Sequence, residues 1–472
     1  MSARSAPSRN RLVALLVAGT YFMENLDASA IVTALPAMAQ SFDVAAPRLS
    51  IGLSAYLLSL AVCIPLSGWL ADRFRPSRIF PLAIGVFTFA SLLCALSGSL
   101  WSFTAARVLQ GLGGAMMVPV GRLVVLRRTE KHELVRAVAI LTWPALVAPI
   151  LGPYVGALIT HALSWHWIFL LNLPLGAAAL AASVWLVRDD QRSLRTFDLP
   201  GFLWTALASA ALMLAVELAS HTPTRPVATL SMLGLGLGSA ALAIRHLRRA
   251  PHPLLDLRLL RIPTFAVVMG GGSLFRIAIS TAPFLLPLMF QLAFGMSATR
   301  AGALLLALFA GNLAMKPATT ALIRRFGFRR VLLVNGLLVA AGFALCALFG
   351  EGTPLWFIAA VLFFCGLTRS MQYTVLNTIG FADVPQPQMN SATTLVSMAQ
   401  QFNVGVGIAF GALALKLAAL LHGHTDGASQ ANDFRLAFAL VALLTLLALV
   451  DALRLPHDAG AQVSGHQAAV KR

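Results

Sequence analysis

Charged residues and cysteines are both scarce in this sequence. Of 472 residues, only 11% are Asp, Glu, Lys or Arg, whereas 58% are hydrophobic. Soluble globular proteins have about 25% charged residues, so the composition excludes that class and predicts a polytopic membrane protein. The four cysteines all lie inside apolar runs and lack the spacing of a metal site. We therefore predict buried, unpaired thiols, and no metal or other cofactor.

Acidic residues are fewer than basic ones, 17 against 35, and the formal net charge is +18. Such an excess can indicate nucleic-acid binding. Here, however, Lys and Arg cluster in short segments between apolar runs, which is the positive-inside pattern of membrane proteins. We therefore predict no nucleic-acid partner. The sequence has no GxSxG, HExxH or P-loop motif, so we predict neither an enzyme nor an ATP-driven pump.

The apolar runs predict fourteen membrane-spanning helices, because about 20 apolar residues cross a bilayer. The expected spans are about 12–35, 49–71, 79–98, 101–121, 137–160 and 166–187, then 199–219 and 227–245, then 263–291, 299–321, 330–349, 354–376, 391–420 and 434–454. With the N-terminus in the cytoplasm, only Arg48, Arg225, Arg300 and Arg435 among the basic residues outside the spans fall on the outer side. This bias predicts that both termini are cytoplasmic.

An internal echo indicates two halves. The segment from Gly68 to Arg78 and the segment from Leu322 to Arg330 occupy the same place in the first and last six-span blocks. Repeated halves of this kind are typical of secondary transporters. We therefore predict an all-α fold of four parts. These are an N-terminal six-helix half (1–187), two inserted helices with their linkers (188–262), a C-terminal six-helix half (263–455) and a cytoplasmic tail (456–472).

Two carboxylates interrupt the first apolar run. Glu24 and Asp27 are three residues apart and share one face of a helix. An ionised carboxylate at the bilayer centre costs about 2.5–3.5 kcal/mol, so such residues usually have a function. In the fourth span Arg107 must pair or face water, and either carboxylate is a natural partner. Because the histidines fall in loops, tails or span ends, the carboxylates are the candidate proton carriers.

Five segments in the first half carry a family resemblance. They are Leu26-Asp27 to Ala34-Leu35-Pro36, Gly68 to Arg73, Arg107 to Ala115, Gly152 to Gly156, and Trp165 to Gly176. Because these segments occur in the order and at the spacing typical of that family, the chain resembles the major facilitator superfamily. Within it the chain resembles the 14-helix drug:proton antiporter branch (EmrB/QacA-like), and in that branch the MdtD-type bacterial exporters. The second half matches in span layout more than in motif.

The resemblance implies roles for several residues. Asp27 and Arg107 would couple protons, whereas Glu24 is proposed on physical grounds alone. Gly68, Asp72 and Arg73 resemble the cytoplasmic gating loop. In it, Asp72 is expected to cap the next helix and to pair with basic residues across the interface between the halves, a contact that breaks when the inside opens. Pro149, Gly152, Pro153 and Gly156 resemble the antiporter-type helix motif. The sequence departs from the family pattern at Arg75, Ala157 and Arg324.

Polar residues inside other spans are candidates for a substrate cavity, because hydrocarbon cannot solvate them. We select Gln110, Arg276, Gln372 and Asn403. The leading hypothesis is a monomeric transporter in the bacterial inner membrane, surrounded by lipid, that exports hydrophobic or amphipathic small molecules in exchange for protons. A narrower metabolite or sugar exporter of the same fold is the alternative. A non-transporting membrane sensor or scaffold is the third hypothesis.

Overall fold

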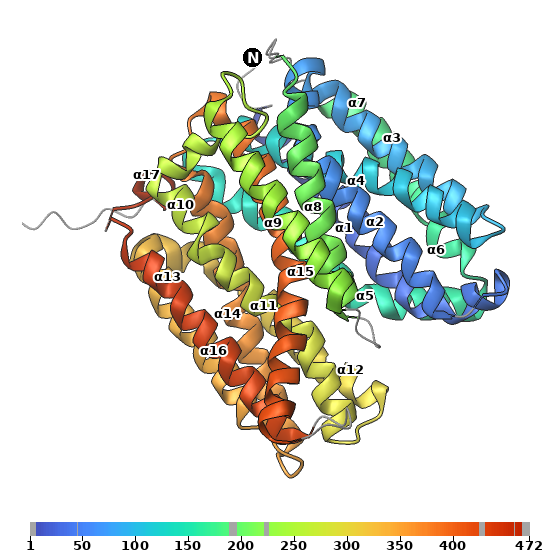
Figure 1. The fold of residues 1–472 in the computed structure, drawn as a ribbon. Helices are drawn as coiled ribbons and strands as arrows, with labels where there is room; N and C mark the ends of the chain where they lie inside the picture. Colours follow the sequence, from blue (N-terminus) through green and yellow to red (C-terminus); the bar gives the residue numbers. More distant parts are fainter. Residues whose placement is uncertain are drawn as a thin grey trace, which may run out of the picture. The chain divides into compact units, whose positions relative to one another are not determined.

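The computed structural model describes residues 6–44, 46–187, 196–220, 226–423, 430–456 and 458–464, and within these ranges the chain is helical with no β-strand (Figure 1). Eleven helical segments of the described chain are long and apolar enough to cross a membrane. Three further helices are not among these eleven segments: the shorter apolar helix α12 (Ala298–Ala314) and the long helices α1 (Ala6–Ser41) and α5 (Leu134–Ala162). The all-helical, multi-pass class is therefore as predicted.

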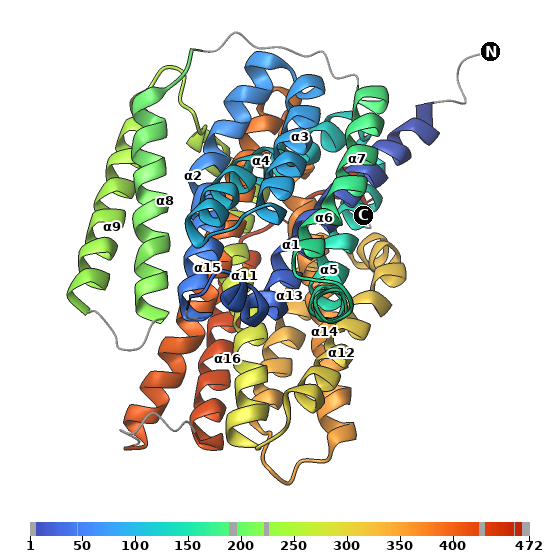
Figure 2. The ribbon, with the colours of Figure 1, turned by 90° about the vertical axis from the view of Figure 1, so that its right-hand side faces the viewer.

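The chain divides into two compact units, and each is described separately. The first contains residues 1–129, 140–257 and 385–398, and the second contains residues 130–139, 258–384 and 399–472. The inserted helices α8 (Leu199–Ser220) and α9 (Pro226–Arg249) thus group with the first unit, where α8 packs on α2. Figure 2 shows α8 and α9 side by side.

In the first unit α3 (Pro76–Ala95) packs on both α4 (Leu100–Arg128) and α7 (Asn172–Leu186) (Figure 1). This unit also contains α2 (Ser50–Phe74) and α6 (His166–Leu170). Helix α4 begins at a capping box, in which Ser99 and Ser102 satisfy each other's backbone N–H groups. Most of α4 is buried, including the side chains of Arg107 and Gln110.

In the second unit α12 packs on α14 (Leu355–Ala382), and α13 (Lys316–Ala347) packs on α14 and α16 (Ala431–Leu453). The helices of this unit besides α12 are α10 (Pro263–Met269), α11 (Gly271–Leu288), a π-helical turn (Met289–Ala293), α13 (Lys316–Ala347), α14 (Leu355–Ala382), α16 (Ala431–Leu453) and α17 (Ala461–Ser464). Helix α15 (Met389–Leu421) belongs partly to each unit. The expected span 263–291 is therefore divided at Gly270, and 166–187 comprises α6 and α7.

The two echo loops have the same backbone conformation. Arg75, between α2 and α3, has φ 69° and ψ 138°. Gly327, the matching residue of the second copy, has φ 74° and ψ 164°, and it bends α13 between the expected spans 299–321 and 330–349. Positive φ favours glycine, because glycine has no β-carbon. The departure at Arg75 noted from the sequence therefore keeps the backbone turn while placing a large side chain in it.

Candidate functional site: a buried charge network

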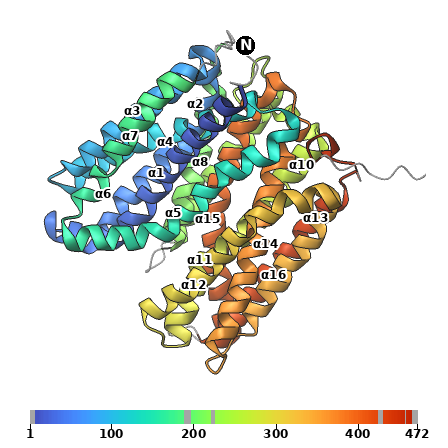
Figure 3. The ribbon, with the colours of Figure 1, turned by 180° about the vertical axis from the view of Figure 1, so that it is seen from behind.

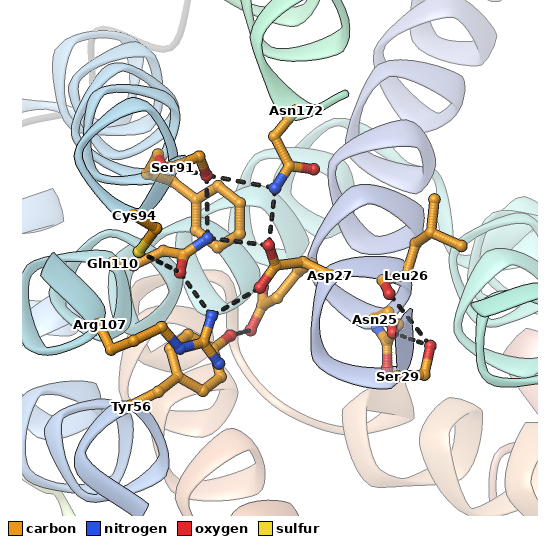
Figure 4. A network of polar contacts seen from close by, with 12 residues as sticks. Asn25, Leu26, Asp27, Ser29, Tyr56, Ser91, Cys94, Arg107, Gln110 and Asn172 are labelled. Atoms are coloured by element: carbon orange, nitrogen blue, oxygen red, sulfur yellow. Dashed lines mark hydrogen bonds and ion pairs between the residues drawn. The ribbon is translucent and has the colours of Figure 1, made fainter. Parts of the chain in front are cut away.

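Asp27 of α1 forms a buried ion pair with Arg107 of α4 (Figure 4). Arg107 Nη1 donates to Asp27 Oδ2 at 2.7 Å, and the side chains are 1% and 0% exposed. The pair that the sequence left open is therefore with Asp27 and not with Glu24. Removing one partner of such a buried pair typically costs about 3–5 kcal/mol, because the remaining charge is left without compensation.

Neutral polar residues satisfy the second oxygen of Asp27. Asn172 Nδ2 donates to Asp27 Oδ1 at 2.7 Å, and Gln110 Nε2 donates to the same atom at 3.1 Å. Both amides also donate to Ser91 Oγ, at 3.2 and 2.9 Å, respectively. Four helices thus contribute to one network: α1, α3, α4 and α7. Gln110, which we selected for the substrate cavity, lies in this network and is fully buried.

Tyr56 of α2 connects this network to Glu24. The Arg107 guanidinium lies 4.2 Å from the centre of the Tyr56 ring, a cation–π contact. The Tyr56 hydroxyl donates to Glu24 Oε1 at 3.3 Å. Glu24 Oε2 is buried and has no partner among the described protein groups. The two carboxylates therefore have different environments: Asp27 is fully compensated, and Glu24 is not.

Sequence reasoning missed Asn172, Ser91 and Tyr56. Asn172 lies within a segment that carries the family resemblance, and a polar amide inside an apolar run was a usable signal. Ser91 and Tyr56 gave no such signal, because single hydroxyl groups are common in membrane helices. Their importance follows only from packing of α2 and α3 against α4.

The loop motif brings Gly68 close to the start of α15. A β-carbon at Gly68 would lie 2.7 Å from Thr394 Oγ1, and Asn390 Nδ2 donates to the Gly68 carbonyl at 2.6 Å. Asp72 contacts Arg127 of α4 at 3.4 Å, whereas Arg73 is exposed. Helix α3 begins at Pro76 without a side-chain cap, so the expectation that Asp72 caps it is wrong.

A solvent-open cleft adjoins this loop in the first unit. Its walls are Gly68, Trp69, Asp72, Thr196, Asp198, His252, Pro253, Leu254, Asn390, Ser391 and Thr394. Asp198, next to α8, accepts from the backbone N–H of Gly201 and Leu254, both at 3.0 Å, and contacts His246 Nε2 at 2.7 Å. The linkers of the inserted helices are thus fastened beside the loop motif.

The glycines of the antiporter-type motif lie against the part of α1 that follows Asp27, and Figure 3 shows α5 running beside α1. A β-carbon at Gly152 would overlap Ser29 Oγ, and one at Gly156 would overlap the Ala30 carbonyl. Close approach of α5 to α1 therefore requires glycine at both positions. Pro153 is exposed, and the side chain of Pro149 lies outside the described residues.

The other three cavity candidates lie in the second unit. Arg276 of α11 is 2% exposed and donates to the Val268 carbonyl at 3.1 Å and to Asn377 Oδ1 at 3.3 Å. Gln372 is fully buried, and its Oε1 accepts from Asn335 at 2.7 Å. Asn403 is also buried, and its Nδ2 has no described partner.

A buried ion pair inside an all-helical, multi-pass chain is typical of membrane transporters. The family model of the Major Facilitator Superfamily matches residues 17–408 and 268–469. The chain therefore belongs to the Major Facilitator Superfamily, a family of transporters.

Relatives with known names support this assignment. The chain is 35% identical over 445 residues to the "Putative multidrug resistance protein MdtD" of Pectobacterium atrosepticum, covering 94% of this chain and 96% of that protein. It is likewise 35% identical over 457 residues to the protein of the same name from Escherichia coli strain 55989, covering 96% of each.

Solved structures agree on the fold. The human organic anion transporter MFSD10 (TETRAN) superposes with a TM-score of 0.67 at 15% identity, covering 94% of this chain and 99% of that one. The proton:xylose symporter XylE gives 0.68 at 15% identity, with coverage of 97% and 98%. At this identity the likeness concerns the fold alone.

Proposed function

We propose that this chain is a proton-coupled secondary transporter that exports hydrophobic or amphipathic compounds across the bacterial inner membrane by alternating access. The supporting observation is the Asp27–Arg107 pair, which is almost completely buried. Charged groups in such a position are costly and typically mark ion or proton pathways. The names of the MdtD relatives support a drug-like substrate.

In the proposed mechanism Asp27 exchanges a proton with the two sides of the membrane in turn. The ionised carboxylate is held by Arg107, Asn172 and Gln110. Protonation removes the negative charge and weakens the attraction to Arg107, so the packing of α1 against α4 changes with the proton. Glu24 has one buried oxygen without a described partner, and we assign it the role of a second proton-carrying acid.

Proton-coupled flux in reconstituted vesicles tests this function. We expect wild-type vesicles to accumulate at least one compound of a panel of dyes, drugs and metabolites under a pH gradient. Asp27→Asn should abolish uphill accumulation, and Glu24→Gln should weaken it. Glu351→Gln, in an exposed turn before α14, is the matched control and should behave as wild type. Uphill transport by Asp27→Asn would overturn the assignment of Asp27, and accumulation of a single sugar alone would favour the narrower exporter.

We also propose the topology and the organisation of the chain. Fourteen spans with both termini in the cytoplasm agree with the distribution of basic residues. The proposed parts are 1–187, 188–262, 263–455 and 456–472, acting as a monomer. Single cysteines at Arg48 and Arg78 should react with an impermeant maleimide from outside and inside, respectively. The reverse pattern would refute the orientation.

A further inference from the structure

Buried positive charge collects along one helix of the second unit. Arg369 lies near the middle of α14, and its Nε and Nη1 atoms are buried without a partner among the described protein groups. Its one described contact is distant, 5.8 Å from the guanidinium carbon to the centre of the Tyr373 ring. An arginine in a membrane helix needs an acceptor, because neither hydrocarbon nor an aromatic ring replaces its hydrogen bonds.

Two further cations bind the same helix. Lys316, at the start of α13, donates from Nζ to Thr374 Oγ1 at 3.0 Å. Arg276 of α11 donates to Asn377 Oδ1 at 3.3 Å. At 1.5 Å per residue, positions 369 to 377 span about 12 Å, and at 100° per residue the three attachment points lie within an arc of about 140°. The three cations therefore reach one side of α14.

The surrounding amides add unsatisfied donors. Gln372 Nε2, Asn403 Nδ2 and Asn312 Nδ2 are buried without described partners, and so is one acceptor, Asn312 Oδ1. Asn312 lies one turn before Lys316, and the backbone of α12 at Asn312 packs directly on Gly366 of α14. Most of the unpartnered buried atoms in this region are therefore hydrogen-bond donors, and a ligand that satisfies them must supply acceptors.

Acidic residues are absent from the same helices. The sequences of α11, α12, α13, α14 and α15 contain neither Asp nor Glu. Glu351 lies in an exposed turn between α13 and α14, and two other acids of this unit are engaged near helix ends. Asp383 accepts from Thr264 at 2.9 Å, and Asp451 accepts from the N–H of Gly271 at 2.8 Å. The membrane-embedded carboxylates of the first unit thus have no counterpart on these helices of the second.

We propose that this side of α14 binds the negatively charged group of the substrate, so that the transported compound is an amphipathic organic anion bearing a carboxylate or an equivalent group. Arg369 is the principal contact, because a guanidinium binds a carboxylate with two parallel hydrogen bonds. Lys316 adds positive charge, and Tyr373 provides an aromatic surface for the apolar body. This inference rests on the proposed transport function and specifies its substrate class.

Equilibrium binding to the purified full-length protein in detergent tests the inference without requiring transport. The probes are radiolabelled 2-naphthoate, 2-naphthamide and 2-naphthyltrimethylammonium, which share one ring system and differ in charge. We expect wild type to bind naphthoate at least tenfold more tightly than the ammonium probe. Arg369→Gln should weaken naphthoate binding about 10- to 100-fold, the worth of a hydrogen bond to a charged group, and should change naphthamide binding less than twofold.

Two further variants distinguish charge from structure. Arg369→Lys keeps the charge and should recover part of the lost naphthoate affinity. Arg300→Gln, at the exposed outer end of α12, is the matched control and should bind as wild type does. Equal binding of the three probes by wild type, or an unchanged naphthoate affinity in Arg369→Gln, would overturn the proposal and indicate that solvent alone satisfies these donors. If Arg369→Gln does not fold, the order of the probes on wild type decides.

The failure of this inference and the failure of the transport function give different results. Preferential naphthoate binding without any proton-coupled flux in vesicles would refute transport and retain the anion site. Proton-coupled export of the ammonium probe but not of naphthoate would retain transport and refute the anion site.

Discussion

At position 75, glycine should give a more stable protein than alanine. Arg75 is held at φ 69° and ψ 138°, a region in which residues with a β-carbon are strained. Such strain costs on the order of 1–3 kcal/mol, and the greater freedom of glycine in the unfolded chain offsets roughly 0.5–1 kcal/mol of the gain. The difference between Arg75→Gly and Arg75→Ala isolates the β-carbon, because both variants lose the arginine side chain. We expect Arg75→Gly to be more stable than Arg75→Ala by roughly 0.5–2 kcal/mol.

Reversible unfolding in mixed SDS and dodecylmaltoside micelles measures this difference. Gly327 provides the matched experiment in the second loop, because it has nearly the same φ and ψ. Gly327→Ala should therefore lose about what Arg75→Gly gains over Arg75→Ala, roughly 0.5–2 kcal/mol. The reasoning that a β-carbon is strained in these turns would be refuted by two results together. These are equal stability of Arg75→Gly and Arg75→Ala, and an unchanged unfolding free energy for Gly327→Ala.

Three other substitutions test the described contacts. Asn172→Leu removes a hydrogen bond to the buried Asp27 carboxylate, so the unfolding free energy should fall by about 1.5–3 kcal/mol, and vesicle transport should slow; an unchanged value for both would contradict the network. Gly152→Val should destabilise the protein in the same unfolding assay far more than Pro153→Val does, because only the former clashes with Ser29; similar losses would argue against close packing there. Asp198→Ala removes three hydrogen bonds and should cost about 1.5–4 kcal/mol, with faster trypsin cleavage after α9 as the second readout; undiminished protease resistance would contradict the anchoring role.

The sequence was sufficient for the helical fold and for the family. Long apolar runs interrupted by basic loops leave few alternatives. The places where the helices break or bend inside the apolar runs were harder to predict from the sequence. The division at Gly270 between α10 and α11 and the kink at Gly327 depend on local backbone geometry, which hydropathy does not report. The fourteen-span count and the orientation remain predictions.

The charged members of the site were visible from the sequence because charges are rare in apolar runs. The spacing of Glu24 and Asp27 placed both on one face of α1 but could not decide which one meets Arg107. That choice depends on how α4 is positioned against α1. The neutral members, such as Asn172, were not predicted because their role depends on contacts between helices distant in the sequence.

The division between the two units falls inside two helices as well as in the connections between helices. Helix α5 passes from one unit to the other between Ala139 and Ile140, and α15 does so between Met398 and Ala399. These are the fifth helices of their respective halves. A mechanical consequence follows, because a continuous helix resists bending more than a loop does. Displacement of one unit against the other would bend α5 and α15. Pro153 lies within α5 and lacks the backbone N–H that would otherwise resist such bending.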